Sequence, residues 1–308
     1  MRILVVGAGA IGGYFGGRLL EAGRDVTFLV RPRRADQPAR TGLSVRSRFG
    51  DVDLPAPMVM AEQLGEAFDL VLLSCKAFDL DSAMASFAPA VGPDTAILPL
   101  LNGMRHLDAL ERRFGRSAVL GGQCAISTTL DADGRILHLN DVHSLSFGER
   151  DGSPTARVAA IADCFADANF DSNASNTIMQ EMWEKWVFIS ALAGITCLMR
   201  APIGDIVAGG GAEIATSLLD ECATIARGQG FPPRQPAMQR FRATVTMAGS
   251  PFAASMLRDI ERGARTEAEH IFGDLLRQDR DPSKYPILRI AYAHLLTYEA
   301  QRARAHTE

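Results

Sequence analysis

The sequence predicts an α/β protein in two parts, an N-terminal doubly wound sheet followed by an all-α C-terminal domain. Three observations support this prediction. The chain opens on a short apolar run, a glycine-rich turn and a helical pattern. Up to about residue 170 short apolar runs alternate with helical patterns, and from Ile178 onward every long segment has helical periodicity. A chain of 308 residues is long enough for two domains, which we expect to span residues 1–172 and 173–308.

The first element is a strand over residues 3–6, since these residues are apolar as in a strand covered on both faces. Gly7, Gly9 and Gly12 follow at the G-x-G-x-x-G spacing, which allows a tight turn, close approach to a pyrophosphate and close helix packing. The helix that starts here directs free N–H groups at the phosphates. The predicted cofactor-binding residues of this turn are Gly7, Ala8, Gly9, Ala10, Ile11 and Gly12. The turn therefore predicts a Rossmann-type domain, the alternative being a tight strand-to-helix turn without a ligand.

The second strand, over residues 25–30, indicates which dinucleotide binds. An NAD site places a carboxylate at the end of this strand, about twenty residues past the glycines, to bind the ribose 2′-hydroxyl. Here that position is Arg31, and Arg33 and Arg34 follow. A guanidinium group suits a 2′-phosphate, so we expect NADP (NADPH) rather than NAD. The alternative is a solvated basic loop.

The rest of the first domain continues the alternation of strands and helices. Two short runs, 43–45 and 52–54, predict a hairpin excursion. Further strands are expected at 70–75, 96–101, 118–120, 126–129, 136–139 and 145–147, and helices at 78–90, 106–114 and 154–168. Turns such as 131–134 allow the last four strands to complete the sheet in antiparallel fashion.

The second domain is predicted to be entirely helical. A polar segment at 171–176 marks the change of period. Helices are expected at 178–199, 212–228, 235–248, 256–279 and 286–304, separated by glycines and prolines. Ligands of open α/β sheets bind beyond the carboxyl ends of the strands, so we expect the chemistry in the cleft between the two domains.

Composition excludes several classes of function. The net charge is −4 and no dense basic run extends beyond 31–34, so no nucleic-acid partner is expected. The five cysteines and six histidines lack metal-ligand spacing, which favours reduced cytosolic thiols and no metal site. The charge-free run 186–199 is shorter than the roughly eighteen residues that a membrane span needs. Since the first strand begins at residue 2 or 3, leaving no room for a signal peptide, we expect a soluble, cytoplasmic protein.

Four polar residues are candidates for binding or chemistry. Lys76 and Asn102 follow predicted strands, where a lysine binds a phosphate or carboxylate and an Asn-Gly pair binds a ribose or substrate oxygen; the alternative is an ordinary loop. Lys185 lies between two tryptophans just before the long apolar run, and in a partly desolvated cleft its ammonium becomes a usable general acid. The alternative is a lysine that extends to water. Glu267 lies in a helical segment rich in charge, so its alternative is a solvated helix face.

Together these residues occur in motifs that resemble a known family. The motifs are GAGAIGGYFGGRL at the N-terminus, CKAFD at 75–79, LLNGM at 100–104, W-x-K at 183–185 and SMLRDIERGARTE at 255–267. Over nearly its whole length the chain resembles the ketopantoate reductases (2-dehydropantoate 2-reductases). The resemblance implies NADPH-dependent reduction of the carbonyl of a 2-oxo acid, most directly ketopantoate to pantoate, a step of pantothenate biosynthesis.

The resemblance also implies roles for single residues. Lys185 matches the catalytic lysine that protonates the carbonyl oxygen as hydride arrives, and Glu267 matches a glutamate close to both cofactor and substrate. The matched binding residues are Asn102 and Ser255 for substrate or cofactor oxygens, and Lys76 and Arg31 for the cofactor. A preorganised ammonium stabilises the negative charge that hydride attack builds on oxygen.

Four positions depart from the family pattern. Where ketopantoate reductases carry asparagines, this chain has Ile189, Ala193, Ile203 and Phe252. An apolar site discriminates weakly in favour of a hydroxylated substrate. The substrate therefore stays open between ketopantoate and a more apolar 2-oxo acid or related carbonyl compound, and a third interpretation is a dinucleotide-binding sensor without turnover. The apolar faces of the helical domain allow either a homodimer or an internal core.

Overall fold

The computed structural model describes residues 1–31 and 42–305. Contacts between Cα atoms divide the chain into two compact units. The first unit holds Met1–Leu101 and His106–Met179, and the second holds Asn102–Arg105 and Gln180–Glu308. The predicted boundary after residue 172 falls earlier, inside a short strand of the first unit, β10 (Asp171–Ala174).

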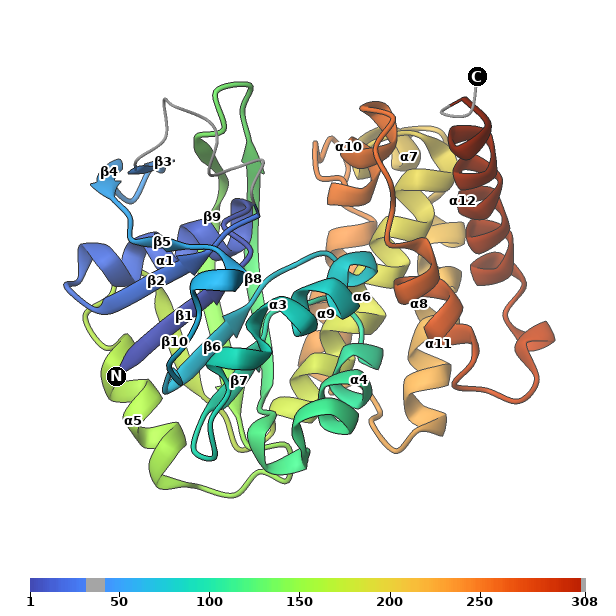
Figure 1. The fold of residues 1–308 in the computed structure, drawn as a ribbon. Coiled ribbons are helices and arrows are strands. Elements are labelled where there is room, and N and C mark those ends of the chain that lie inside the picture. The colour runs from blue at the N-terminus through green and yellow to red at the C-terminus, as the bar shows by residue number, and fades with distance from the viewer. Residues whose placement is uncertain (32–41, 306–308) are drawn as a thin grey trace. The chain divides into compact units, whose positions relative to one another are not determined.

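The first unit contains a five-stranded sheet in the order β5-β2-β1-β6-β7 (Figure 1). Its strands are β1 (Arg2–Val6), β2 (Asp25–Leu29), β5 (Met58–Val59), β6 (Leu70–Leu73) and β7 (Ala96–Pro99). Every pairing in this sheet is parallel, so the carboxyl ends of all five strands lie along one edge. All residues of β6 and β7 are buried, as expected for strands covered on both faces. The predicted fold class, a parallel α/β sheet followed by a helical domain, is confirmed.

The later strands form a second sheet and do not complete the first one, so that prediction was wrong. This sheet contains β3 (Gly42–Arg46), β4 (Val52–Pro55), β8 (Gly121–Leu130), β9 (Ile136–Gly148) and β10. The hairpin of β3 and β4 is antiparallel, as predicted, and β8 pairs antiparallel with β9. The runs predicted as separate strands at 136–139 and 145–147 are the two ends of β9, because the polar residues Asn140 and Asp141 in its middle interrupt the apolar pattern without ending the strand. Residues 116–118 form a 3-10 turn before β8, and of the strand expected at 118–120 only an isolated parallel bridge between Val119 and Ile97 is present.

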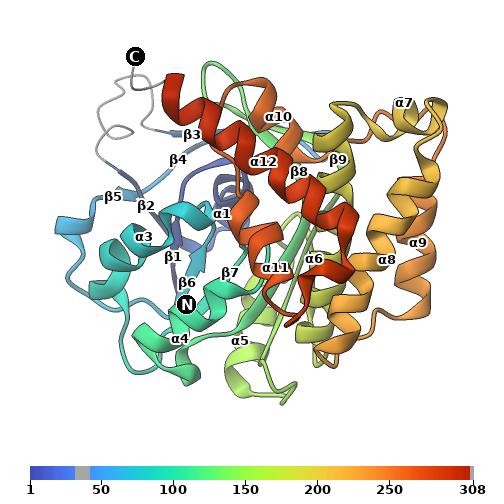
Figure 2. The same cartoon turned by 90° about the vertical axis from the view of Figure 1, so that its right-hand side faces the viewer.

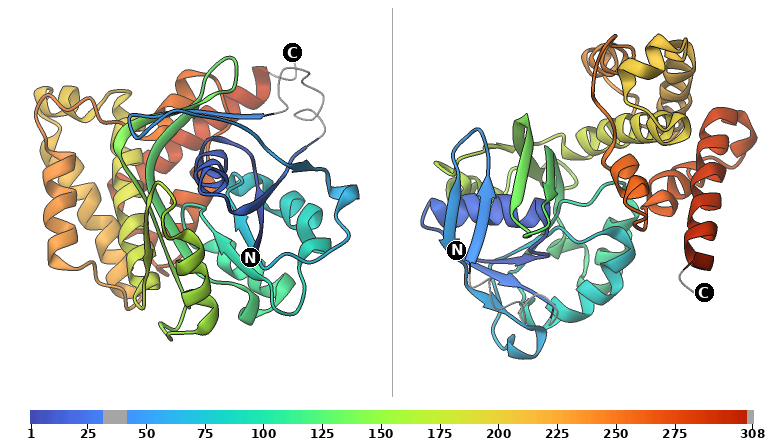
Figure 3. Two further views of the ribbon diagram at one scale, coloured as in Figure 1. Left: turned by 90° about the vertical axis from the view of Figure 1, so that its left-hand side faces the viewer. Right: turned by 90° about the horizontal axis from the view of Figure 1, so that it is seen from above.

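Helix α1 (Ala10–Glu21) contacts strands of both sheets, and Figure 3 shows it between them. A Cβ atom at Gly16 would lie 2.7 Å from the ring of Phe28, and one at Gly13 would lie 2.4 Å from Ile136 Cδ1. Such close approach on two faces explains why this helix is rich in glycine despite the cost to helix stability. The helix ends at Glu21, and Gly23, two residues further on, has a φ of +73°, as is common just past a helix C-terminus.

Among the described residues before residue 170, three further α-helices follow α1. They are α3 (Leu80–Phe87), α4 (Arg105–Phe114) and α5 (Ala156–Phe165). Helix α3 is shorter than predicted because 3-10 turns flank it at 77–79 and 88–90. The rings of Phe87 and Phe114 stack with their centroids 5.1 Å apart.

The second unit is helical (Figure 2). It contains α6 (Ile178–Met199), α7 (Ile203–Ala208), α8 (Ala212–Gly228), α9 (Gln235–Val245), α10 (Ser255–Glu261), a π-helix (Glu269–Gly273), α11 (Asp274–Leu276) and α12 (Pro286–Ala305). The single helix predicted at 256–279 was wrong, since α10 ends near Gly263, whose φ is +66°. Helix α7 was not predicted.

Helix α6 is the one helix in the described ranges that is long and apolar enough to cross a membrane by length and composition. However, 72% of its apolar window is buried inside the structure. This burial is typical of a core helix.

A cluster of aromatic rings and histidines lies between α1 and the second sheet. The Tyr14 hydroxyl and Nδ1 of His143 form a 2.7 Å hydrogen bond, and the ring of Phe49 stacks on His143 at 3.9 Å. His143 is 6% exposed. Burial lowers the pKa of the His143 imidazole, as do the nearby charges of His138 and Arg18, while the Asp171 carboxylate opposes them.

This lowered pKa predicts acid sensitivity of the fold. Because the unfolded chain takes up a proton on His143 more readily than the folded protein, the contribution to stability is complete above pH ~6.5. It is lost as the pH falls through the folded pKa, with a slope of at most about 1.4 kcal/mol per pH unit. Urea unfolding at pH 7.5 and 5.5 measures the effect. His143→Gln is expected to reduce the difference between the two pH values, and an unchanged difference would contradict the assignment.

Candidate functional site

The turn after β1 contains three glycines, and the surroundings of each glycine differ. Gly7 has a φ of +97°, a backbone conformation that other residues rarely adopt. A Cβ atom at Gly12 would lie 2.3 Å from the carbonyl oxygen of Gly7 and 2.1 Å from Ser74 Oγ, so no side chain fits there. A Cβ atom at Gly9 would meet nothing within 4 Å, so Gly9 borders open space at the start of α1.

This open space fits the pyrophosphate of a dinucleotide. Gly9 is the N-cap residue of α1 and supplies no capping side chain, and the first turn of the helix contains no acidic residue. The N–H groups of the first turn have no partner within a helix and therefore suit an anion. Of the other predicted residues of the turn, Ala8 is buried, and Ala10 and Ile11 are half-buried.

The predicted cofactor residues Arg31 and Lys76 lie at the same edge of the parallel sheet. Arg31 follows β2 and Lys76 follows β6, and these two strands flank β1. The guanidinium of Arg31 forms a 3.0 Å ion pair with Asp79, which was not predicted. Lys76 is exposed and precedes the 3-10 turn that ends at Asp79. The neighbouring Arg33 and Arg34 lie outside the described residues.

In the second unit, Lys185 lies on α6 and is half-buried. Its neighbour Trp186 is 1% exposed and donates a 3.0 Å hydrogen bond from Nε1 to the carbonyl oxygen of Ile271 in the π-helix. On its other side, the buried Glu184 accepts hydrogen bonds from Arg234 Nε at 2.8 Å and Nη2 at 2.7 Å. The segment that carries Lys185 is therefore held from both sides.

Glu267 lies two residues before the π-helix and not on a long solvated helix, so the expectation of a charged helical segment was wrong. Its carbonyl oxygen accepts a 2.9 Å hydrogen bond from the backbone N–H of Ile271. Because Ile271 also accepts from Trp186, one residue connects the Lys185 segment with the Glu267 segment. A π-helix is rare and occurs frequently at functional sites.

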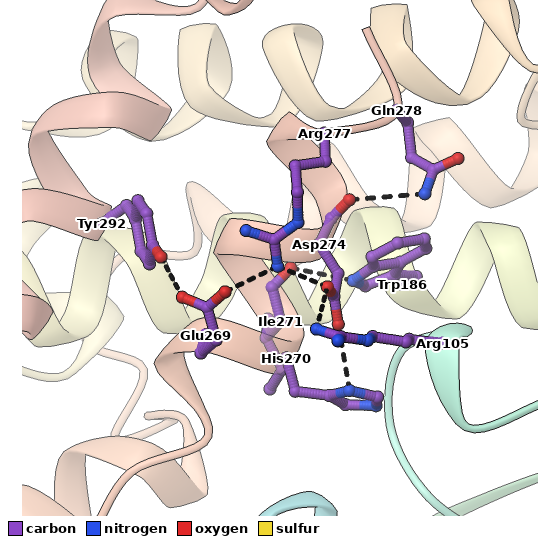
Figure 4. Close-up of polar contacts among 9 residues, drawn as sticks. All are labelled: Arg105, Trp186, Glu269, His270, Ile271, Asp274, Arg277, Gln278 and Tyr292. Carbon is purple, nitrogen blue, oxygen red and sulfur yellow. Dashed lines mark hydrogen bonds and ion pairs between the residues drawn. The ribbon is translucent and has the colours of Figure 1, made fainter. Parts of the chain in front are cut away.

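The segment that follows Asn102 contacts the region of the π-helix. Gly103 has a φ of +77°, and a Cβ atom there would lie 3.0 Å from Nε2 of His270. Two residues further on, Arg105 forms a 3.3 Å ion pair with Asp274 (Figure 4). Asp274 also contacts His270 Nδ1 at 3.1 Å.

The network continues toward α12. Arg277 contacts both Asp274 and Glu269, the latter at 2.7 Å, and Glu269 also accepts a hydrogen bond from Tyr292 (Figure 4). The sequence analysis missed this network. Its signal was present as the spacing of His270, Asp274 and Arg277, which are neighbours on a helix at four and three residues.

Asp274 is the most buried carboxylate of this network, with a side chain 5% exposed. Burial raises the pKa of Asp274, but hydrogen bonds from His270 and Arg277 outweigh burial and hold the pKa below its ordinary value. Asp274→Asn is therefore expected to lower the free energy of unfolding by about 1–3 kcal/mol. Urea unfolding at pH 7 measures this loss. Glu269→Gln, at a side chain 57% exposed, is the matched control and should change stability by less than about 1 kcal/mol; equal losses would contradict the assignment.

Phe252, one of the positions that depart from the family pattern, belongs to an aromatic stack. The ring of Phe188 stacks on Phe241 at 4.8 Å and on Phe252 at 6.4 Å. Phe188 follows Lys185 by three residues and Ile189 follows it by four, so all three share one face of α6. The carbonyl oxygen of Phe252 accepts a 2.9 Å hydrogen bond from the Ile203 N–H.

The remaining predicted residues are Ser255 and Ala193. Ser255 is exposed and begins α10, three residues after Phe252. Ala193 is buried on α6. Among residues 1–31 and 42–305, no group of His, Cys, Asp and Glu has the arrangement of a metal site.

Comparison with known proteins identifies the family. Residues 3–152 match the family described as ketopantoate reductase PanE/ApbA, and residues 177–295 match its C-terminal part. An uncharacterized oxidoreductase of Bacillus subtilis, YkpB, is 40% identical over 98% of this chain and 100% of its own length.

Solved structures support the same relationship. The crystal structure of 2-dehydropantoate 2-reductase from Geobacter metallireducens has a TM-score of 0.86 at 27% identity, and covers 96% of this chain and 99% of its own. The ternary structure of D-mandelate dehydrogenase with NADH and anilino(oxo)acetate also has a TM-score of 0.86, over 98% and 100% of the two chains. At 19% identity it is similar in fold alone. This chain is an oxidoreductase that belongs to the ketopantoate reductase PanE/ApbA family.

Proposed function

We propose that this protein reduces the carbonyl of a 2-oxo acid to a hydroxyl group with NADPH, and that Lys185 is the general acid. The observation that supports this most is the connection of the Lys185 and Glu267 segments through Trp186 and Ile271. Two hydrogen bonds at Ile271 join the segment that carries the ammonium to the segment that carries the carboxylate. Ketopantoate is the first candidate substrate, because relatives across nearly the whole chain are named 2-dehydropantoate 2-reductase.

The choice of NADPH rests on the residues at the sheet edge. Arg31 presents a guanidinium group beyond β2, where it suits a 2′-phosphate. Lys76 presents a second positive charge beyond β6. The glycine turn between them would receive the pyrophosphate at the start of α1.

A nicotinamide dinucleotide bound at the glycine turn would supply the hydride. The ammonium of Lys185 donates a hydrogen bond to the substrate carbonyl oxygen, which stabilises the negative charge that develops there. A proton then moves from Nζ of Lys185 to that oxygen, and the neutral amine regains a proton from solvent. The Asn102 amide and the Ser255 hydroxyl bind substrate or cofactor oxygens, and the Glu267 carboxylate orients the hydroxyl group that forms.

A second candidate is a more apolar 2-oxo acid. The aromatic stack around Phe188 favours this candidate. Ile189 follows Phe188 on α6, and Ile203 donates a backbone hydrogen bond to Phe252 of the stack. Family members carry asparagines at the positions of both isoleucines. A hydroxylated side chain would lose its hydrogen bonds against such surfaces, whereas an apolar one would not.

A substrate panel distinguishes the candidates. Loss of nicotinamide absorbance is followed with NADPH and then NADH, using ketopantoate, 2-oxoisovalerate and phenylpyruvate. Turnover with ketopantoate supports the first candidate, and turnover with only the apolar acids supports the second. Tight NADPH binding with no turnover on any 2-oxo acid would overturn the reductase proposal in favour of the sensor.

We also propose that the enzyme acts in the cytoplasm, where its cysteines would stay reduced. All five cysteines are free thiols, as a reducing compartment maintains them. A homodimer remains a prediction for this chain, and size-exclusion chromatography with light scattering tests it.

A further inference from the structure

The ion pair of Arg31 and Asp79 joins two strands that are not neighbours. Arg31 follows β2 and Asp79 closes the 3-10 turn after β6, while β1 and its glycine turn lie between these strands. The 3.0 Å contact therefore spans the carboxyl end of β1, beside the turn that suits a dinucleotide. This places an acidic group within reach of the same cofactor region as the arginine.

Neither partner is deeply buried. The side chain of Arg31 is 64% exposed and that of Asp79 is 32% exposed, so both are accessible to a ligand. Ser82 supports the pair, because its hydroxyl lies 3.4 Å from Arg31 Nη2 and donates a 3.1 Å hydrogen bond to the carbonyl oxygen of Asp79. The three residues form one small polar group at the sheet edge.

The two charges favour different nucleotides. A 2′-phosphate binds the guanidinium of Arg31, but it must compete with the Asp79 carboxylate for that group and is repelled by it. A ribose 2′-hydroxyl is instead a hydrogen-bond donor, and a carboxylate is the acceptor that NAD sites provide for it. Asp79 therefore opposes NADPH and favours NADH.

We infer that Asp79 is a cofactor-specificity residue that weakens the preference for NADPH set by Arg31. This inference rests on the proposed binding of NADPH at Arg31. Removing the negative charge while keeping the shape releases the guanidinium for the 2′-phosphate. The same change removes the acceptor for a 2′-hydroxyl.

The test measures binding in the absence of any substrate. Dissociation constants for NADPH and NADH are determined from nicotinamide fluorescence with wild type, Asp79→Asn and Arg31→Ala. We expect Asp79→Asn to tighten NADPH binding about three- to five-fold and to leave NADH binding unchanged or weaker. The gain should shrink in high salt, because it is electrostatic. Asp81→Asn, at an exposed position two residues further on, is the matched control and should change neither constant.

The two variants distinguish failure of the inference from failure of the proposed NADPH site. If Arg31→Ala weakens NADPH binding and Asp79→Asn leaves both constants unchanged, the inference fails while the proposed NADPH site stands. If Arg31→Ala leaves NADPH binding unchanged, the proposed site itself fails, and the inference fails with it. Weaker NADPH binding in Asp79→Asn would also overturn the inference, because Asp79 would then position Arg31 and not compete for it.

Discussion

Lys185→Ala is expected to lower kcat by about 10²–10⁴-fold, the usual contribution of a general acid, on whichever 2-oxo acid the panel identifies. The truncation removes the ammonium that stabilises the developing alkoxide and supplies its proton. Within the described parts of the chain, Lys185 has no ion-pair partner, so its removal leaves no buried charge uncompensated. We therefore expect little change in melting temperature and in the dissociation constant for NADPH.

Lys284→Ala is the matched control for this variant. The Lys284 side chain is 58% exposed and lies 3.7 Å from Asp279, in a surface ion pair whose loss costs little. Its kcat should equal that of wild type. If Lys185→Ala retained more than about a tenth of the wild-type kcat, another group would have to deliver the proton.

Gly9→Ala and Gly12→Ala are expected to separate cofactor binding from folding. A methyl group at Gly9 meets no protein atom within 4 Å, so the variant should fold with wild-type stability. It would project into the space that a pyrophosphate needs, and the affinity for NADPH should fall by about ten-fold or more. The same methyl at Gly12 would lie 2.3 Å from the Gly7 carbonyl oxygen, so this variant should lose binding and also about 1–3 kcal/mol of stability.

Urea unfolding and nicotinamide fluorescence measure the two properties on the same samples. Gly65→Ala is a neutral reference, since a Cβ atom there meets nothing within 4 Å and the position is exposed. Wild-type NADPH affinity in Gly9→Ala would show that the pyrophosphate does not approach this part of the turn. Reduced stability in Gly9→Ala would show that the fold itself requires glycine at this position.

The parallel sheet could be predicted because its strands are apolar and buried on both faces, as β6 and β7 are. Helix α6 was predicted with its observed bounds for a similar reason, since its apolar residues continue through the helix. β10 was missed because its four residues are exposed, three of them are polar, and it pairs with β9 without an apolar face. Apolar periodicity carries no signal for such a strand.

The candidate site was predicted unevenly. The glycine turn follows from residue chemistry, because Gly7 and Gly12 are required by backbone conformation and space. The roles of Lys185 and Glu267 came from resemblance and remain proposals. The Arg105–Asp274 contact and the Arg31–Asp79 pair could not be predicted, because each joins side chains that are far apart in the sequence and meet only in the tertiary fold.

The assignment of Asn102–Arg105 to the second unit has a consequence for which parts of the coding sequence specify that unit. The polypeptide passes between the units at 101/102, at 105/106 and at 179/180, so the second unit is discontinuous in sequence. A fragment that begins at residue 180 lacks Arg105 and leaves Asp274 without one of its two arginine partners. The helical unit is therefore not encoded by one continuous segment, and recombination that exchanges it whole must also carry over these four residues from within the sequence of the first unit.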